Sequence, residues 1–204
     1  MPSDAGDAQT PLPATYDGPV LLIGTIDGAG DRLADLLGRH ARLCRVPRTR
    51  LLTDLSVAIE RNQPALAVYG LPEQYWRTAV GAFFDSLQRH HASRAGKGRW
   101  VAYVSSSTVT LEELGRLFPT AQFVHVITRP RGGAGRIVAA NRRIGARLPA
   151  GAYLEVAEGE MLTGAEACAR RVLRFLGEDA PDLDLEQEVL VDLVDVRLSD
   201  TERR

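Results

Sequence analysis

Short, continuous runs of apolar residues alternate along this chain with segments of helical periodicity. The runs cover residues 19–24, 100–104, 123–127 and 152–156, and each is too short for an independent helix. Strands that are apolar throughout are typical of parallel sheets covered by helices on both faces. The sequence therefore predicts an α/β fold with three layers, α/β/α, around a mostly parallel central sheet.

The segments between these runs carry apolar residues at helical spacing. The first such segment begins near Asp31, which is placed to cap a helix. In the segment 73–94 the pattern puts Trp76, Phe83, Phe84 and Leu87 on one face. Further helices are predicted over 49–61, 111–118, 134–147 and 165–176, the last ending at Gly177 as a C-terminal cap.

Composition limits the class of protein. The chain has 204 residues, with 25 basic and 26 acidic side chains and 2 cysteines, so it has neither a disulfide framework nor a cysteine zinc site. No apolar run approaches the ~20 residues that cross a bilayer. We expect a bacterial, cytoplasmic protein with a flexible lead-in (1–17), one α/β domain (18–180) and an acidic tail (181–204).

Ligands of parallel α/β sheets bind outside the carboxyl ends of the strands, so three loops are candidates for a site. The first, 24–31, joins a strand to a helix and contains Gly24, Thr25, Gly28 and Gly30, whose backbone could cradle a phosphate. It is not a Walker A loop, because Gly30 and Asp31 occupy the Lys and Ser/Thr positions. Asp27 and Asp31 also oppose an anion there.

The other two loops carry hydroxyls and arginines. Ser105, Ser106 and Ser107 follow the strand at 100–104 and could orient a substrate, or serve as turn and cap residues. Between residues 128 and 147 there are six arginines and no acid, which favours an anion site. Nucleic acid is the least favoured partner, because the net charge is −1 and aromatic residues do not interleave with these arginines.

At this point the motifs resemble bacterial members of the sulfotransferase family, which use 3′-phosphoadenosine 5′-phosphosulfate (PAPS) on a P-loop-like α/β fold. The similar stretches are WVAYV at 100–104, LEELGRLFPTAQFVHVITRPR at 111–131 and the segment from 153 that ends in RRVLRFLG at 170–177. The resemblance covers residues from about 19 to 177. It implies the sulfotransferase fold and, through the family, PAPS as a cofactor.

At the positions where the family has its cofactor-binding and catalytic residues, this chain has other residues. The resemblance puts Asp27 at the basic position of the phosphosulfate loop, Asp31 at a hydroxyl position, and Tyr103 where a catalytic basic residue is expected. Thr128 aligns with the arginine for the 3′-phosphate and Arg136 with a serine. The resemblance leaves cofactor binding to the first-loop residues and a rearranged set in the second nucleotide loop. These are Gly24, Thr25, Gly28, Gly30, Thr128, Arg129, Arg131 and Arg136.

Three functions remain open. The leading hypothesis is a sulfotransferase homologue that has lost PAPS use and acts as a binding protein or as an accessory to a biosynthetic pathway. The alternatives are an active PAPS-dependent sulfotransferase for a small alcohol or phenol, and a repurposed enzyme in which Asp27 and Asp31 work as acid and base or hold a cation. The expected partner is a small molecule or a protein, and the helices at 49–61 and 73–94 could support a homodimer.

Overall fold

The computed structural model describes residues 17–24, 28–128 and 134–179. Within these ranges five strands form one sheet in the order β2-β3-β1-β4-β5, and all neighbouring pairs are parallel. The strands are β1 (Val20–Gly24), β2 (Leu43–Arg45), β3 (Arg99–Ser105), β4 (Gln122–Ile127) and β5 (Tyr153–Ala157). The predicted parallel sheet is confirmed, and β1 lies at its centre.

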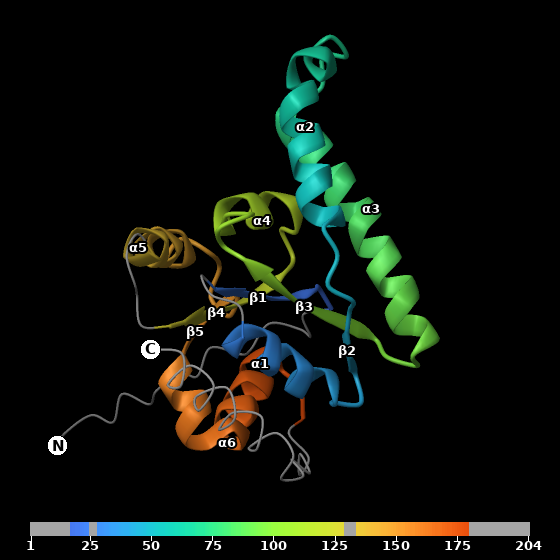
Figure 1. Cartoon of the computed structure of the whole chain (residues 1–204). Coiled ribbons are helices and arrows are strands. Elements are labelled where there is room, and N and C mark those ends of the chain that lie inside the picture. Colours follow the sequence, from blue (N-terminus) through green and yellow to red (C-terminus); the bar gives the residue numbers. More distant parts are fainter. Residues whose placement is uncertain (1–16, 25–27, 129–133, 180–204) are drawn as a thin grey trace, which may run out of the picture.

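Helices cover both faces of this sheet (Figure 1). On one face α1 (Ala29–Gly38) and α6 (Glu158–Leu176) pack over Leu22 in one apolar cluster. The opposite face, which contains Leu21, is covered by α3 (Glu73–Arg94), α4 (Leu111–Leu117) and α5 (Ala134–Gly145). The alternation of Leu21 and Leu22 between the two clusters confirms the predicted α/β/α layering.

Several elements differ from the sequence prediction, among them the helix expected over 49–61, which runs over Leu51–Ala67. The strand β2 was not predicted, because Leu43–Arg45 is too short to show a pattern. The helix α6 begins at Glu158, earlier than predicted, and its two parts are joined at Gly164, which has non-helical backbone angles. Its C-terminal end was predicted correctly, since Gly177 adopts the left-handed conformation (φ 72°) of a helix cap.

The predicted apolar face of α3 is only partly buried. Phe84 is buried, but Phe83 is 52% exposed and Leu87 is 41% exposed. The buried stripe includes Gly81, whose Cα lies so close to the carbonyl oxygen of Leu117 that a Cβ would overlap it. Close approach of α3 to α4 therefore sets the buried face. The residues of this stripe are Arg77, Gly81, Phe84, Gln88 and Ala92.

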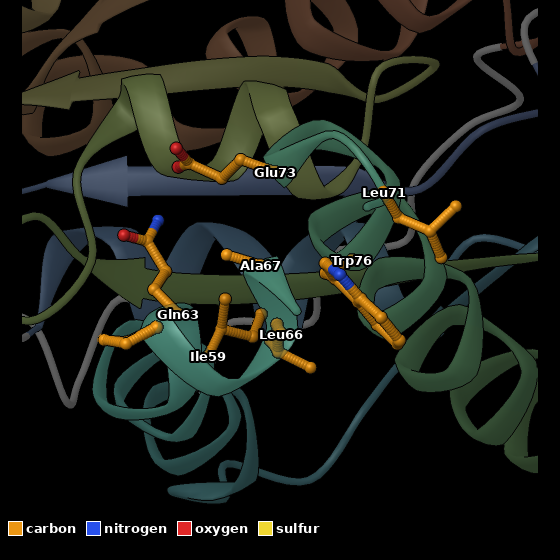
Figure 2. Close-up of a pocket in the computed structure, with 8 residues that line it drawn as sticks. Ile59, Gln63, Leu66, Ala67, Leu71, Glu73 and Trp76 are labelled. Carbon is orange, nitrogen blue, oxygen red and sulfur yellow. The ribbon is translucent and has the colours of Figure 1, made fainter. Parts of the chain in front are cut away.

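The helices α2 (Leu51–Ala67) and α3 form a hairpin whose connected end projects away from the sheet (Figure 1). A mostly apolar pocket of about 340 Å³ lies between them near that end (Figure 2). Pro64 and Trp76 are among its lining residues. This pocket is separate from the carboxyl edge of the sheet, where the predicted site residues lie.

Candidate functional site

Backbone and side-chain hydrogen bonds join three elements at the carboxyl edge of the sheet. The amide of Ser106 donates to the carbonyl oxygen of Gly24 at 2.8 Å, which ties the end of β3 to the end of β1. The Ser106 hydroxyl is buried and accepts from Nδ2 of Asn141 in α5, at 3.1 Å. Ser106 therefore holds the edge together, whereas the hydroxyls of Ser105 and Ser107 bond each other at 2.8 Å on the exposed side.

Asp31 does not cap α1, contrary to the sequence prediction. The helix begins at Ala29, so Asp31 is its third residue, and no side chain within the described ranges caps the first turn. The Asp31 carboxylate instead pairs with Arg45 Nη2 at 2.7 Å and with Arg48 Nη1 at 3.0 Å. Arg45 also pairs with Asp35 through its Nε, at 3.0 Å. Asp31, an acid of the predicted phosphate loop, thus holds one arginine from β2, Arg45, and one from the segment after β2, Arg48.

Tyr103 packs against the helix that follows the first loop. A Cβ on Gly30 would lie 2.2 Å from the Tyr103 ring, so the ring occupies the space that a side chain there would need. Tyr103 is 5% exposed, and the Arg48 guanidinium lies 5.8 Å from its ring centroid, at the distance of a cation–π contact. Packing against Tyr103 therefore accounts for glycine at position 30.

A basic side chain that the sequence analysis did not single out lies at the start of α1. Gly28 has a positive φ of 126°, and a Cβ there would be 3.8 Å from Nη2 of Arg32. The Arg32 Nε is buried and has no hydrogen-bond partner among the residues that the structure describes. Arg32 is four residues beyond Gly28, so one helical turn brings its guanidinium back toward the loop.

The second nucleotide loop is described only at its two ends. Thr128, directly after β4, is buried, and Arg136 is exposed in the first turn of α5, which contains no acid. The predicted residues Thr25, Asp27, Arg129 and Arg131 lie outside the described ranges. Their roles therefore stay predictions.

A cavity of about 220 Å³ opens between the end of β3 and the segment that joins β2 to α2. Its floor includes the buried rings of Phe84 and Trp100, and Tyr103 and Ser105 also line it. Three arginines complete the lining: Arg45, Arg48 and Arg50. We call this space the β3 cavity. The sequence analysis missed these arginines, although the run RVPRTR at 45–50 places three within six residues.

His125 belongs to a separate network under α5. It is fully buried, and its Nδ1 lies 2.6 Å from the hydroxyl of Tyr153, which donates to Glu155 at 3.0 Å. Burial lowers the pKa of His125 to about 4, although Glu155 opposes the shift. Burial of Tyr153 and its bond to Glu155 raise the pKa of that hydroxyl. His125 is thus a neutral histidine of the core.

The described ranges contain no cluster of three or more His, Cys, Asp or Glu side chains suited to a metal ion. They also contain no helix that is long and apolar enough to cross a bilayer. Because two arginines occupy the Asp31 carboxylate, a cation or an acid–base role there would require both ion pairs to open.

Comparisons with known proteins define the fold. No protein-family model matches the chain, and no curated protein matches it significantly. The solved "Sulfotransferase Domain from the Curacin Biosynthetic Pathway" is similar, with a TM-score of 0.55 and 10% identity over 85% of this chain and 78% of that one. The "Sulfotransferase Domain from the Synechococcus PCC 7002 Olefin Synthase" has a TM-score of 0.53 and 14% identity, over 89% and 82%. The chain therefore has the sulfotransferase-like α/β fold.

Proposed function

We propose that this chain is a binding protein that holds a small anionic molecule at the carboxyl edge of its sheet and does not transfer a sulfuryl group from PAPS. One observation carries the proposal: Asp31 is paired with both Arg45 and Arg48. Two positive charges thereby stand beside the β3 cavity, while the acid that would serve as a base is engaged.

The positions that transfer would use support the same proposal. Sulfuryl transfer requires positive charge near the bridging oxygen and a base for the acceptor hydroxyl, as phosphoryl transfer does. Tyr103, at the position of the catalytic basic residue, is neutral and buried against α1. The only lysine, Lys97, bonds the carbonyl oxygen of Gly38 at the amino end of β3. Tyr103 and Lys97 therefore support a binding role over sulfuryl transfer from PAPS.

A titration with 3′-phosphoadenosine 5′-phosphate, the product that PAPS leaves after transfer, tests the proposal. A ligand at 100 times its Kd stabilises its protein by about 2.7 kcal/mol, which raises the Tm of a chain this size by about 5–10 °C. We expect no shift at millimolar nucleotide and no turnover of PAPS with phenol or a small alcohol. A saturable shift accompanied by turnover would overturn the proposal.

A PAPS-dependent sulfotransferase is the second candidate, and Arg32 is the observation that favours it. Its guanidinium near Gly28 could replace the positive charge that Asp27 removes from the first loop. If the nucleotide binds, Arg32→Gln should abolish the shift, whereas Arg61→Gln on the exposed side of α2 should not. A nucleotide shift that survives Arg32→Gln would exclude this role of Arg32.

A further inference from the structure

The charged residues that line the β3 cavity are all basic, and the residues of its floor are apolar. Its charged lining residues are Arg45, Arg48 and Arg50, and no acid is found among the described residues that line it. Asp31 and Asp35 reach two of these arginines from the α1 side, outside the lining. These two carboxylates offset the charges of Arg45 and Arg48, so within the described ranges Arg50 is the lining arginine whose charge remains for an anion.

The three arginines differ in what they can still bind. Arg45 uses Nε for Asp35, Nη2 for Asp31 and Nη1 for the carbonyl oxygen of Val46. Arg48 is held by Asp31 and lies over the Tyr103 ring. The guanidinium of Arg50 makes no hydrogen bond or ion pair within the described ranges, and it is exposed. Arg50 thus retains the planar fork that binds a carboxylate through two parallel hydrogen bonds.

The floor and the volume restrict the rest of the ligand. Phe84 and Trp100 are in edge-to-face contact with a centroid distance of 5.9 Å, and Leu21 and Ala102 also line the cavity. An apolar cavity of about 150 Å³ holds one benzene molecule. The β3 cavity measures about 220 Å³, which leaves space for one six-membered ring and a small charged group.

We infer that the β3 cavity binds a single-ring carboxylate, with the ring over Trp100 and Phe84 and the carboxylate on Arg50. Thr49 and Thr53 also line the cavity, and their hydroxyls can donate to the carboxylate, whereas the hydroxyl of Thr108 already donates to the carbonyl oxygen of Ser105 at 2.8 Å. This inference rests on the proposed function for the location of the ligand, and it adds the chemical class.

Benzoate is the probe, and two relatives of benzoate separate the parts of the inference. Benzamide keeps the ring without the charge, and acetate keeps the charge without the ring. We expect benzoate to raise the Tm saturably and the other two to have no effect at the same concentration. Equal shifts with benzamide would overturn the role of Arg50, and equal shifts with acetate would overturn the role of the floor.

Benzoate binding to single variants, and the fluorescence of Trp100, test whether benzoate binds in the β3 cavity. Arg50→Gln should weaken benzoate binding roughly 10- to 100-fold, as expected for the loss of a charge-assisted hydrogen bond, and Arg50→Lys should restore part of it. Arg61→Gln, in the helix that Arg50 precedes but outside the cavity lining, should leave it unchanged. In a Trp76→Phe background Trp100 is the only tryptophan, so benzoate should change its emission. Unchanged emission, or unchanged affinity in Arg50→Gln, would overturn the inference.

These outcomes are independent of the nucleotide test. Nucleotide binding with turnover would overturn the proposed function, yet a benzoate response lost in Arg50→Gln would still support the cavity assignment. The absence of any benzoate response would overturn the cavity assignment and leave the nucleotide result to decide the proposed function.

Discussion

At the scale of single residues, Arg99 and Glu178 form a buried ion pair at the amino edge of the sheet. Their side chains are 1% and 2% exposed, and Arg99 Nη1 lies 3.0 Å from the Glu178 carboxylate. Arg99 also donates to Gly18 and to the side chain of Gln122. One guanidinium thereby joins β3, β4 and the segment that follows α6, at the edge opposite the candidate site.

Removing the charge of Glu178 should therefore be costly. We expect Glu178→Gln to lower the free energy of unfolding by about 3–5 kcal/mol, because it leaves the Arg99 charge buried without a counterion. The matched control is Glu112→Gln, which breaks an exposed pair with Arg116 and should cost about 1 kcal/mol or less. Urea denaturation at pH 7 measures both, and equal losses would contradict this account.

His125 makes the stability of the fold dependent on pH. Its pKa is about 4 in the folded chain and near 6.5 when exposed, so the unfolded chain takes up the proton first as pH falls. Stability should be unaffected above pH 6.5 and decline between pH 6.5 and 4, by about 3 kcal/mol in total.

The measurement is urea denaturation at several pH values for the wild type and for His125→Gln. Carboxylates titrate in both proteins, so the difference between the two curves isolates the histidine. We expect the variant to lose less stability over this range. Parallel curves would show that His125 does not titrate in this way.

At the scale of elements, the contact between β3 and α1 depends on one glycine. Gly30→Ala would place a methyl group 2.2 Å from the buried Tyr103 ring, so the ring or the helix must move. We expect a loss of about 1–3 kcal/mol, typical of overpacking. Gly115→Ala in α4 is the control, because its Cβ meets nothing within 4 Å, and it should stabilise the helix by up to about 1 kcal/mol.

Thermal unfolding compares these variants, and the double variant Gly30→Ala with Tyr103→Ala tests the cause. If the ring is responsible, Gly30→Ala should cost less in the Tyr103→Ala background than in the wild type. An equal cost in both backgrounds would place the strain elsewhere.

The sequence predicts some of these elements better than others for physical reasons. Runs such as 123–127 are visible because a strand buried on both faces needs apolar residues throughout. The buried stripe of α3 is not visible, because it includes Arg77, Gly81 and Gln88 and depends on the close approach of α4.

The candidate site was predicted in part for a similar reason. Loops at the carboxyl edge follow from the strand order, so Ser105 is expected there, whereas Tyr103 is placed at the site by the resemblance alone. The arginines at 45–50 were missed because only the pairing of β2 with β3, Cys44 opposite Trp100, brings them beside Ser105. The partners of Asp31 were missed for the same reason.

At the scale of the whole molecule, burial is distributed unevenly. The sheet residues Leu21, Leu22 and Ile23 are fully buried, whereas α2 has no buried residue after Ile59. Val68 and Tyr69, at the end of the hairpin, are 86% and 71% exposed. The hairpin end therefore has few interactions that would resist local opening.

Hydrogen exchange followed by mass spectrometry should reveal this difference. Amides at 60–67 should exchange by local opening, well before the amides of β1 and β4, which should exchange only by global unfolding. Urea below the unfolding midpoint should accelerate the sheet amides strongly and the hairpin amides weakly. Equal protection of both regions would contradict the prediction.

The central position of β1 also has a consequence for how the chain folds during synthesis. β1 is made first, yet Val20 pairs with Val101 on one side and with Gln122 on the other. The apolar segment VLLIG therefore stays unpaired until β3 and β4 have been synthesised. Contacts between residues this distant in sequence slow folding, and they prolong the time during which the apolar strand β1 is exposed to solvent. Placing the first strand in the middle of the sheet thus leaves the nascent chain open to aggregation until β3 and β4 have been made.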